Sequence, residues 1–174
     1  MLAAKGCNVL CLDLNLEWAQ KTAELSTARS QKARAIPLKY DVTRAPDFEA
    51  AVEIVLKEFG RLDVLVNKVG IGGAAGTVVE VDMEAWAKGL AINVSSIVQM
   101  AKCCIPGMQK NRKEIRGNIV NKGSVAGLKG ATPHLLHPTS KGAVENMTRA
   151  MAAHHAPDGI RVNCVFPGVS VSAF

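Results

Sequence analysis

Residues 62–76 read LDVLVNKVGIGGAAG, an aliphatic run followed by a glycine-rich stretch. A short run of aliphatic and β-branched residues that ends in small or polar residues is typical of a buried strand. The glycines after it do not have the GxGxxG spacing, and no helical pattern follows them directly. The stretch therefore predicts a strand over residues 62–67 that leads into a flexible loop.

Similar aliphatic runs occur on both sides of this stretch and alternate with longer amphipathic segments. The further predicted strands cover residues 8–13, 35–40, 118–121 and 161–166. The segments with apolar residues near the helical period cover residues 16–28, 47–59, 83–108 and 141–155. The third of these contains Pro106, which predicts a kink or an end of the helix at that point.

This alternation predicts an α/β fold, a doubly wound parallel sheet with helices on both faces. Near-continuous apolar strands fit this architecture because such strands are buried on both sides. The sequence shows no internal repeat, no low-complexity tract and no linker. We therefore expect a single domain over residues 1–174.

The formal net charge of +6 comes from basic residues spread along the chain. Their densest cluster consists of Lys110, Arg112, Lys113 and Arg116. A solvated helix end explains such a cluster more simply than a nucleic-acid patch, because no aromatic platform accompanies it. No apolar run is long enough to span a bilayer. We therefore expect neither a nucleic-acid nor a membrane partner.

The five cysteines are odd in number and include no CxxC pair. Most stand in apolar stretches, which predicts reduced, buried thiols in an intracellular protein. Residues 1–4 have neither a charged region before them nor a long apolar region after them, so no signal peptide is predicted. The expected location is the cytoplasm.

Small or polar residues follow every predicted strand. They are Asp13, Asp41, Asn67 with Gly70, Ser124, and Pro167 with Gly168. In a doubly wound sheet the ligand lies across the carboxyl ends of the strands, so these residues are candidates for one site along that edge. Turns between strands and helices also favour such residues for structural reasons, and this alternative stays open.

Asp13 ends the run Val9 to Asp13 and is the sharpest of the acidic candidates. A carboxylate there can accept hydrogen bonds from both ribose hydroxyls of an adenine dinucleotide. The same charge repels a 2′-phosphate, so Asp13 favours NAD over NADP. The structural alternative is a helix N-cap for the segment that starts near Leu16.

Ser124, His137 and Lys141 form the strongest group of candidate catalytic residues. His137 and Lys141 are one helical turn apart and share a face, and Ser124 ends a predicted strand. A purely structural role for the serine and the lysine stays open. No carboxylate stands out as the orienting partner of a Ser-His-Asp arrangement. The four histidines do not combine with acids at metal-ligand spacing, so no metal site is predicted.

Six short motifs, in order, resemble those of the classical short-chain dehydrogenase/reductase family. They lie at residues 41–43, 65–70, 92–95, 119–128, 140–143 and 161–168. Each motif is short, but six in the family's order and spacing argue against a chance match. The resemblance covers essentially the whole chain and implies a Rossmann-type domain.

The resemblance implies an oxidoreductase that transfers a hydride between a nicotinamide cofactor and a small alcohol or ketone, and Asp13 favours NAD over NADP as that cofactor. It implies that the Ser124 hydroxyl contacts the substrate oxygen, that Lys141 holds the nicotinamide ribose, and that Asn93 holds a water in a proton relay. The implied cofactor-binding residues are Asp13, Asp41, Val42, Asn67, Gly70, Lys141, Pro167, Gly168 and Val169.

His137 stands where the family has its catalytic tyrosine, the general acid/base. Counting the family spacing forward from Ser124 and back from Lys141 arrives at His137 both times. The Lys141 ammonium favours a neutral imidazole, which is a poor acid for an alkoxide-like oxygen. Loss of a general acid/base typically costs about 10²–10⁴-fold in rate. We expect an impaired redox step, with His137 as a substitute acid/base as the alternative.

The resemblance begins at the end of the family's first helix, so the family's first strand and its GxxxGxG turn are missing, and so is its C-terminal part. That turn binds the pyrophosphate, so dinucleotide affinity is expected to fall. In the strand order 3-2-1-4-5-6 the loss of strand 1 leaves strands 2 and 4 without a shared neighbour. Lys68 and Lys122 also depart from the family's motifs.

Three hypotheses follow from these departures. The first is an NAD-preferring oxidoreductase of the family, impaired in this chain. The second is a non-catalytic or decayed relative that serves as a binding or regulatory module. The third is that the chain is part of a longer enzyme. The resemblance also implies a homo-oligomer formed through the helices at 83–108 and 141–155.

Overall fold

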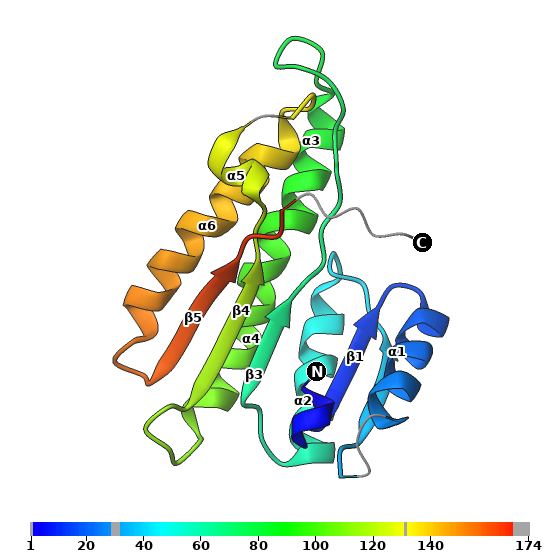
Figure 1. Ribbon diagram of the computed structural model, residues 1–174, viewed down its shortest axis with the longest axis vertical. Helices are drawn as coiled ribbons and strands as arrows, with labels where there is room; N and C mark the ends of the chain where they lie inside the picture. The colour runs from blue at the N-terminus through cyan, green and yellow to red at the C-terminus, as the bar shows by residue number, and fades with distance from the viewer. Residues whose placement is uncertain (1, 29–31, 131, 169–174) are drawn as a thin grey trace. The chain divides into compact units, whose positions relative to one another are not determined.

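The computed structural model describes residues 2–28, 32–130 and 132–168. The chain divides into two compact units, Met1–Arg61 and Leu62–Phe174, called here the N-terminal and the C-terminal unit. Figure 1 shows the N-terminal unit in blue to cyan and the C-terminal unit in green to red. The division falls just before the predicted strand at residues 62–67.

The N-terminal unit contains two strands and two α-helices. Its elements are the short helix η1 (Ala3–Lys5), β1 (Val9–Asp13), α1 (Leu16–Ala28), β2 (Ala35–Lys39) and α2 (Ala45–Phe59). Strands β1 and β2 are parallel, with Val9 opposite Ala35 and Asp13 opposite Lys39. Helix α1 connects them and packs on both. The unit is therefore a βαβ arrangement followed by one more helix.

The C-terminal unit contains the remaining three strands. Its elements are β3 (Val64–Asn67), α3 (Met83–Leu90), the π-helical segment η2 (Ala91–Ser95), α4 (Ser96–Gln109), β4 (Gly117–Lys122), α5 (Val125–Lys129), α6 (Leu136–His155) and β5 (Ile160–Val165). The strands form a parallel sheet in the order β3–β4–β5. The predicted parallel α/β arrangement is confirmed.

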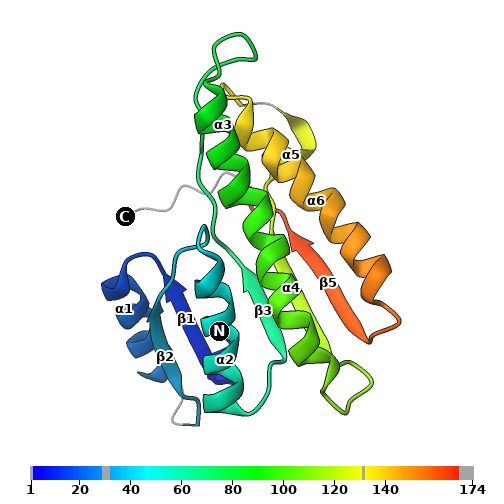
Figure 2. The same ribbon diagram turned by 180° about the vertical axis from the view of Figure 1, so that it is seen from behind.

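Helices α4 and α6 lie on the same face of the three-stranded sheet, behind it in Figure 1 and in front of it in Figure 2. Burial along β4 alternates accordingly, and the buried set includes Ile119 and Asn121. Met108 of α4 and Val144 of α6 are fully buried and belong to the same core. Within the described part of this unit, helices cover one face, whereas the sequence predicted cover on both.

The stretch predicted as one helix over 83–108 consists of α3, η2 and α4. The irregularity lies in the π-helical segment at Ala91–Ser95, and α4 continues past Pro106 to Gln109. Of the two outcomes predicted at Pro106, a kink or an end of the helix, the end was therefore wrong. A π-helical turn inserts an extra residue into the ladder and is frequent at functional sites.

The helical stretch Met83–Gln109 also has the length and composition of a membrane span. It has 27 residues, a mean hydropathy of 1.2 in its most apolar window, and 44% of that window is buried inside the structure. By length and composition alone, the expectation that no segment could span a bilayer was wrong. The core helix of a soluble protein meets the same criteria, so this one helix is weak support for a membrane partner.

Leu136 fixes the start of α6 by inserting its side chain between two glycines. It is fully buried. A Cβ atom at Gly73, in the loop after β3, or at Gly89, in α3, would overlap the Leu136 side chain. The loop, α3 and α6 therefore meet at Leu136, and α6 begins five residues before the predicted start at residue 141.

Among the described residues, β1 pairs with β2 alone and β3 pairs with β4 alone. This matches the expectation that the second and fourth strands of the family's order have no shared neighbour. Val66 of β3 is 50% exposed, which is unusual for an aliphatic residue in the middle of a parallel sheet. One edge of β1 and one edge of β3 thus carry backbone groups without strand partners.

The cysteines are free thiols, but they are less buried than predicted. Cys11 and Cys104 are buried, whereas Cys7, Cys103 and Cys164 are half-buried. Burial raises the pKa of the Cys104 thiol to about 12.

Candidate active site

Lys141 occupies the second turn of α6 and is almost completely buried, with 5% exposure. Its Nζ donates a hydrogen bond to the backbone oxygen of Lys122 over 3.0 Å. A Cβ atom at Gly70 would lie 3.1 Å from this Nζ, and one at Gly127 would lie 2.6 Å from the Lys141 carbonyl carbon. The side chain therefore runs over a glycine of the loop after β3, and α5 packs directly on the backbone that carries it.

Burial lowers the pKa of the Lys141 amine, and the nearby Lys122 ammonium lowers it further. The Cys164 side chain acts in the opposite direction. Lys122 thus acts on the lysine that the sequence predicts as a catalytic residue. Its effect is to make Lys141 release its proton more readily.

Asn93 lies in the π-helical segment and is fully buried. Its Oδ1 accepts a hydrogen bond from the Ile71 amide over 2.8 Å, and its Nδ2 donates to the Ile71 oxygen over 2.9 Å. Nδ2 also donates to the Ser140 hydroxyl over 3.1 Å, and that hydroxyl donates to the His137 oxygen over 3.0 Å. Asn93 therefore holds the loop beside Gly70 against the first turns of α6.

His137 stands in the first turn of α6, one turn before Lys141, and is half-buried. Its Nδ1 is buried and has no hydrogen-bond partner among the described residues. Burial lowers the pKa of the imidazole, the Lys141 charge lowers it further, and a hydrogen-bonding contribution from the Ile71 backbone acts in the opposite direction. The arrangement favours the neutral imidazole that the sequence predicted.

Ser124 follows β4 and caps the N-terminus of α5, where its hydroxyl oxygen accepts a hydrogen bond from the Ala126 amide over 3.2 Å. The structural role that was left open for this serine is therefore real. The hydroxyl hydrogen still remains available for a substrate oxygen, because the cap uses the oxygen only as an acceptor.

A backbone hydrogen bond joins the turn after β5 to the residue that follows Ser124. The Val125 amide donates to the Pro167 oxygen over 3.2 Å, and Pro167 and Gly168 are exposed. Val169, also predicted to contact the cofactor, lies outside the described residues. The structure thus joins the start of α5 to the predicted Pro-Gly turn.

Asn67 ends β3 and takes part in a polar chain that sequence reasoning missed. Its Nδ2 donates to Asn121 Oδ1 over 2.9 Å, and Asn121 Nδ2 donates to Thr148 Oγ1 over 3.0 Å. Asn121 is fully buried and Thr148 nearly so. An asparagine inside an apolar strand was the available signal, because a buried amide requires hydrogen-bond partners. The chain ties β3 and β4 to α6.

In the N-terminal unit, Asp13 ends β1, and its Oδ1 accepts a hydrogen bond from the Asn15 amide over 2.9 Å. The cap of α1 is Asn15, whose Oδ1 accepts from the Glu17 amide over 2.9 Å. The N-cap alternative for Asp13 was therefore wrong. A hollow at this strand end is lined by Asp13, Leu14, Asn15, Leu16, Glu17, Trp18, Gln20 and Lys39.

Asp41 and Val42 lie in the turn between β2 and α2. The Asp41 Oδ1 accepts hydrogen bonds from the Thr43 amide over 2.9 Å and from its hydroxyl over 2.7 Å. These two bonds hold the pKa of the Asp41 carboxyl below its usual value. The Asp41 amide donates to Asp47 over 2.9 Å. Asp41 thus shapes its own turn.

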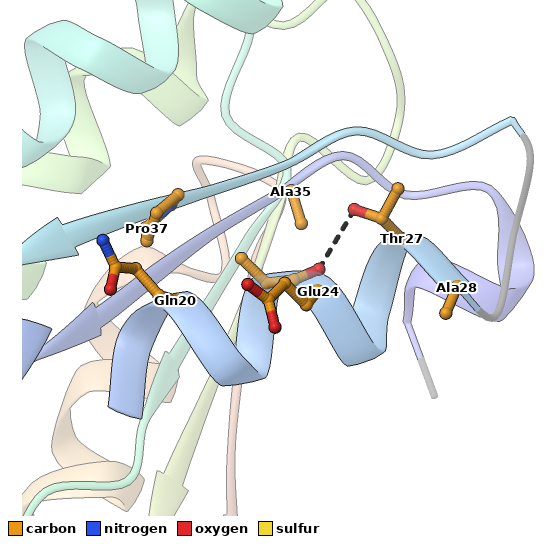
Figure 3. A pocket seen from close by; sticks show the side chains of 7 residues that line it. Gln20, Glu24, Thr27, Ala28, Ala35 and Pro37 are labelled. Atoms are coloured by element: carbon orange, nitrogen blue, oxygen red, sulfur yellow. Dashed lines mark hydrogen bonds between the residues drawn. The ribbon is translucent and has the colours of Figure 1, made fainter. Parts of the chain in front are cut away.

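A second hollow lies between α1 and β2, as Figure 3 shows. It is lined by Gln20, Ala23, Glu24, Thr27, Ala28, Ala35 and Pro37. The Thr27 hydroxyl donates to the Ala23 oxygen over 3.0 Å and is therefore occupied within its own helix. Glu24 is the one carboxylate of this lining, so the hollow offers no acid/base pair. In the described part of the chain, no cluster of His, Cys, Asp and Glu has the arrangement of a metal site.

Comparison with known proteins places these features in a family. A family model described as "Enoyl-(Acyl carrier protein) reductase" matches residues 1–172. The chain is 37% identical to 2-(S)-hydroxypropyl-CoM dehydrogenase 3 of Xanthobacter autotrophicus, over 97% of this chain and 64% of that protein. It is also 37% identical to "Inactive 2-(S)-hydroxypropyl-CoM dehydrogenase 2" of the same organism, over 96% of this chain and 69% of that protein.

The fold is similar to the crystal structure of an NAD⁺-bound xylitol dehydrogenase, with a TM-score of 0.86 and 33% identity. That match covers 96% of this chain and 62% of the xylitol dehydrogenase. The chain thus spans less than two thirds of the length of the first of these relatives and of this dehydrogenase. With its parallel sheets and these matches, the chain belongs to the short-chain dehydrogenase/reductase family of oxidoreductases.

Proposed function

We propose that this chain carries the site of an NAD-preferring oxidoreductase acting on a small alcohol or ketone, and that His137 reduces its rate. The observation that carries the proposal is the arrangement around Lys141. Its Nζ is buried beside Gly70, and Asn93 ties the neighbouring loop to α6 through Ile71 and Ser140. Burial of a lysine ammonium costs free energy, so the burial of Lys141 supports a functional role for it.

A bound nicotinamide cofactor would supply the hydride in such a reaction. The Ser124 hydroxyl donates a hydrogen bond to the substrate oxygen, since its cap on α5 leaves the hydrogen free. Lys141 holds ribose hydroxyls with its ammonium. His137 gives or takes the proton of the substrate oxygen. A neutral imidazole must first be protonated before it can donate, so the reduction direction is slowed most.

Within each unit, taken separately, described residues fit one part of a nicotinamide dinucleotide. Asp13 presents a carboxylate at the end of β1, beside a hollow, as the hydroxyls of an adenosine ribose require. Lys141 presents an ammonium beside Gly70 for the nicotinamide ribose. The xylitol dehydrogenase with the similar fold is NAD⁺-bound, which supports NAD as the preferred cofactor here.

A non-catalytic relative is the second candidate. His137 in the tyrosine position supports it, and so does a relative that is itself named inactive. A third reading is that the chain acts as part of a longer enzyme, since it spans 64% of one dehydrogenase that it matches. A homo-oligomer formed through the helices at 83–108 and 141–155 and a cytoplasmic location also stay predictions.

The test combines cofactor binding with hydride transfer. NADH is titrated into the 174-residue chain and followed by nicotinamide fluorescence, with circular dichroism on the same sample. Reduction of a panel of small ketones is then compared in the parent chain and in His137→Tyr, with His154→Tyr on the same helix as the control. Recovery of a general acid typically corresponds to a gain of about 10²–10⁴-fold.

We expect saturable NADH binding and a faster His137→Tyr variant, with the control unchanged. Binding without any gain in His137→Tyr would support the non-catalytic relative. A folded chain that does not bind NADH would contradict the proposed cofactor site.

A further inference from the structure

Lys39 lies beside Asp13 although it is distant from it in sequence. It ends β2 and stands opposite Asp13 in the register of the two parallel strands. Both residues line the hollow at the carboxyl end of β1. Lys39 is exposed to solvent. The ribose-binding carboxylate of the proposed cofactor site therefore has a cation as its neighbour.

The Lys39 side chain makes no ion pair and no hydrogen bond to any other residue that the structure describes. Asp13 uses one carboxylate oxygen for the Asn15 amide and retains free acceptor positions on both oxygens. The two charges are therefore both available to a ligand, instead of neutralising each other within 4 Å. A ligand that carries both hydroxyl groups and an anionic group matches this pair.

We propose that Lys39 is a cofactor-specificity residue, which lets the Asp13 site accept a nucleotide with a phosphate on its ribose 2′-oxygen. The inference rests on the proposed cofactor site. A phosphate monoester carries about −1.5 to −2 charges near neutral pH. Asp13 alone repels it, whereas Lys39 offsets that repulsion. The difference in affinity between NAD and NADP is therefore small in this chain.

Trp18 provides a fluorescence signal for binding at this site. It lines the same hollow in the first turn of α1, and its side chain is 65% exposed. The chain has two tryptophans, and the other, Trp86, lies in α3 of the C-terminal unit. In a Trp86→Phe background the fluorescence therefore reports binding beside Asp13.

The test uses two nucleotide fragments that differ only in the 2′-phosphate, 5′-AMP and adenosine 2′,5′-bisphosphate. Each is titrated by calorimetry into the 174-residue chain and into Lys39→Met and Lys39→Glu, and Trp18 fluorescence confirms the place of binding. Lys21→Met is the matched control, an exposed lysine of α1 that does not line the hollow. Circular dichroism checks that every variant is folded.

We expect the two fragments to bind the parent chain with dissociation constants within about tenfold of each other. Lys39→Met is expected to weaken binding of the bisphosphate by about 3- to 10-fold, in keeping with a solvent-exposed charge pair. Lys39→Glu is expected to weaken it by more. Binding of 5′-AMP stays unchanged in both, and Lys21→Met changes neither. The effect on the bisphosphate shrinks as salt is raised.

If Lys39→Met changes the dissociation constants of the two fragments equally, or changes neither, the role of Lys39 is overturned. The proposed cofactor site then stays in place. Failure of both fragments to bind the folded parent chain would overturn the proposed site together with the role of Lys39.

Discussion

His137 couples the site to pH through its charge. Its pKa is lowered in the folded chain from an ordinary value of 6.5, mainly by burial and then by Lys141. Between the lowered pKa and about 6.5 the unfolded chain binds more protons at this position than the folded chain does. The free energy of unfolding therefore falls as the pH drops below about 6.5.

His137→Gln removes this contribution, because glutamine does not titrate. We expect urea unfolding to show a smaller loss of stability between about pH 7.5 and about pH 5.5 in this variant than in the parent. The exposed His154 gives the control variant His154→Gln, which retains the parent's dependence. The same pH dependence in all three proteins would mean that the His137 environment does not disfavour its charge.

Single residues of the site could be predicted from the sequence where spacing defined them. Ser124, His137 and Lys141 follow a fixed spacing, and a fixed spacing on a helix implies a shared face. The partners of these residues could not be predicted, because hydrogen bonds such as that from Asn93 to Ile71 depend on how a loop returns to a helix. The cap of α1 could not be predicted either, because Asp13 and Asn15 are both capping residue types. The structure shows that Asn15 is the cap.

At the scale of elements, the contact between the loop after β3 and α6 depends on Gly73. This glycine has a φ of +76°, and a Cβ atom there would overlap Leu136. Gly73→Ala is therefore expected to lower the free energy of unfolding by roughly 1–3 kcal/mol for overpacking, with backbone strain of about 1 kcal/mol in addition. Urea unfolding measures the loss.

Gly72→Ala is the matched control, because no atom lies within 4 Å of a Cβ at that glycine and its φ is not positive. It should change stability little. In the double variant Gly73→Ala with Leu136→Ala the overlap is gone. Its loss in free energy of unfolding should therefore be smaller than the sum of the losses in the two single variants. Simple additivity would show that Leu136 does not press against this loop.

Elements with a strong period could be predicted almost to their ends. Helix α1 has the predicted bounds, since its apolar spacing is bounded by polar residues on both sides. The π-helical segment could not be predicted, because the apolar pattern continues through it without a break. Helix α5 was missed because five residues are too few to show a period.

At the scale of the whole chain, the two compact units are expected to differ in stability. The N-terminal unit has a two-stranded sheet and the C-terminal unit a three-stranded one with a larger set of fully buried side chains. Sheets of two strands are marginal by themselves. Hydrogen exchange in rising urea should therefore show that amides of β1 and β2 open at lower urea than those of β4 and β5.

A single opening free energy for both units would contradict this expectation and indicate one cooperative structure. Residues 9–13 and 160–165 make a suitable pair of segments, since both are parallel strands of similar length. The predicted fold class was confirmed at this scale. The sequence predicted two strands without a shared neighbour only through the family's strand order, and it did not predict two separate sheets, because no local pattern records which strand lacks a neighbour.

The identity of residue 137 has a consequence for how the chain is expected to respond to laboratory selection. Lys141 contacts Gly70, and Asn93 binds the loop beside it, near the position where the sequence predicts His137 in place of the family's tyrosine. Histidine and tyrosine codons differ by a single base, so one point mutation converts His137 to tyrosine. If the proposed function holds, a selection that rewards ketone reduction is expected to recover His137→Tyr from a mutated library before any change elsewhere in the chain.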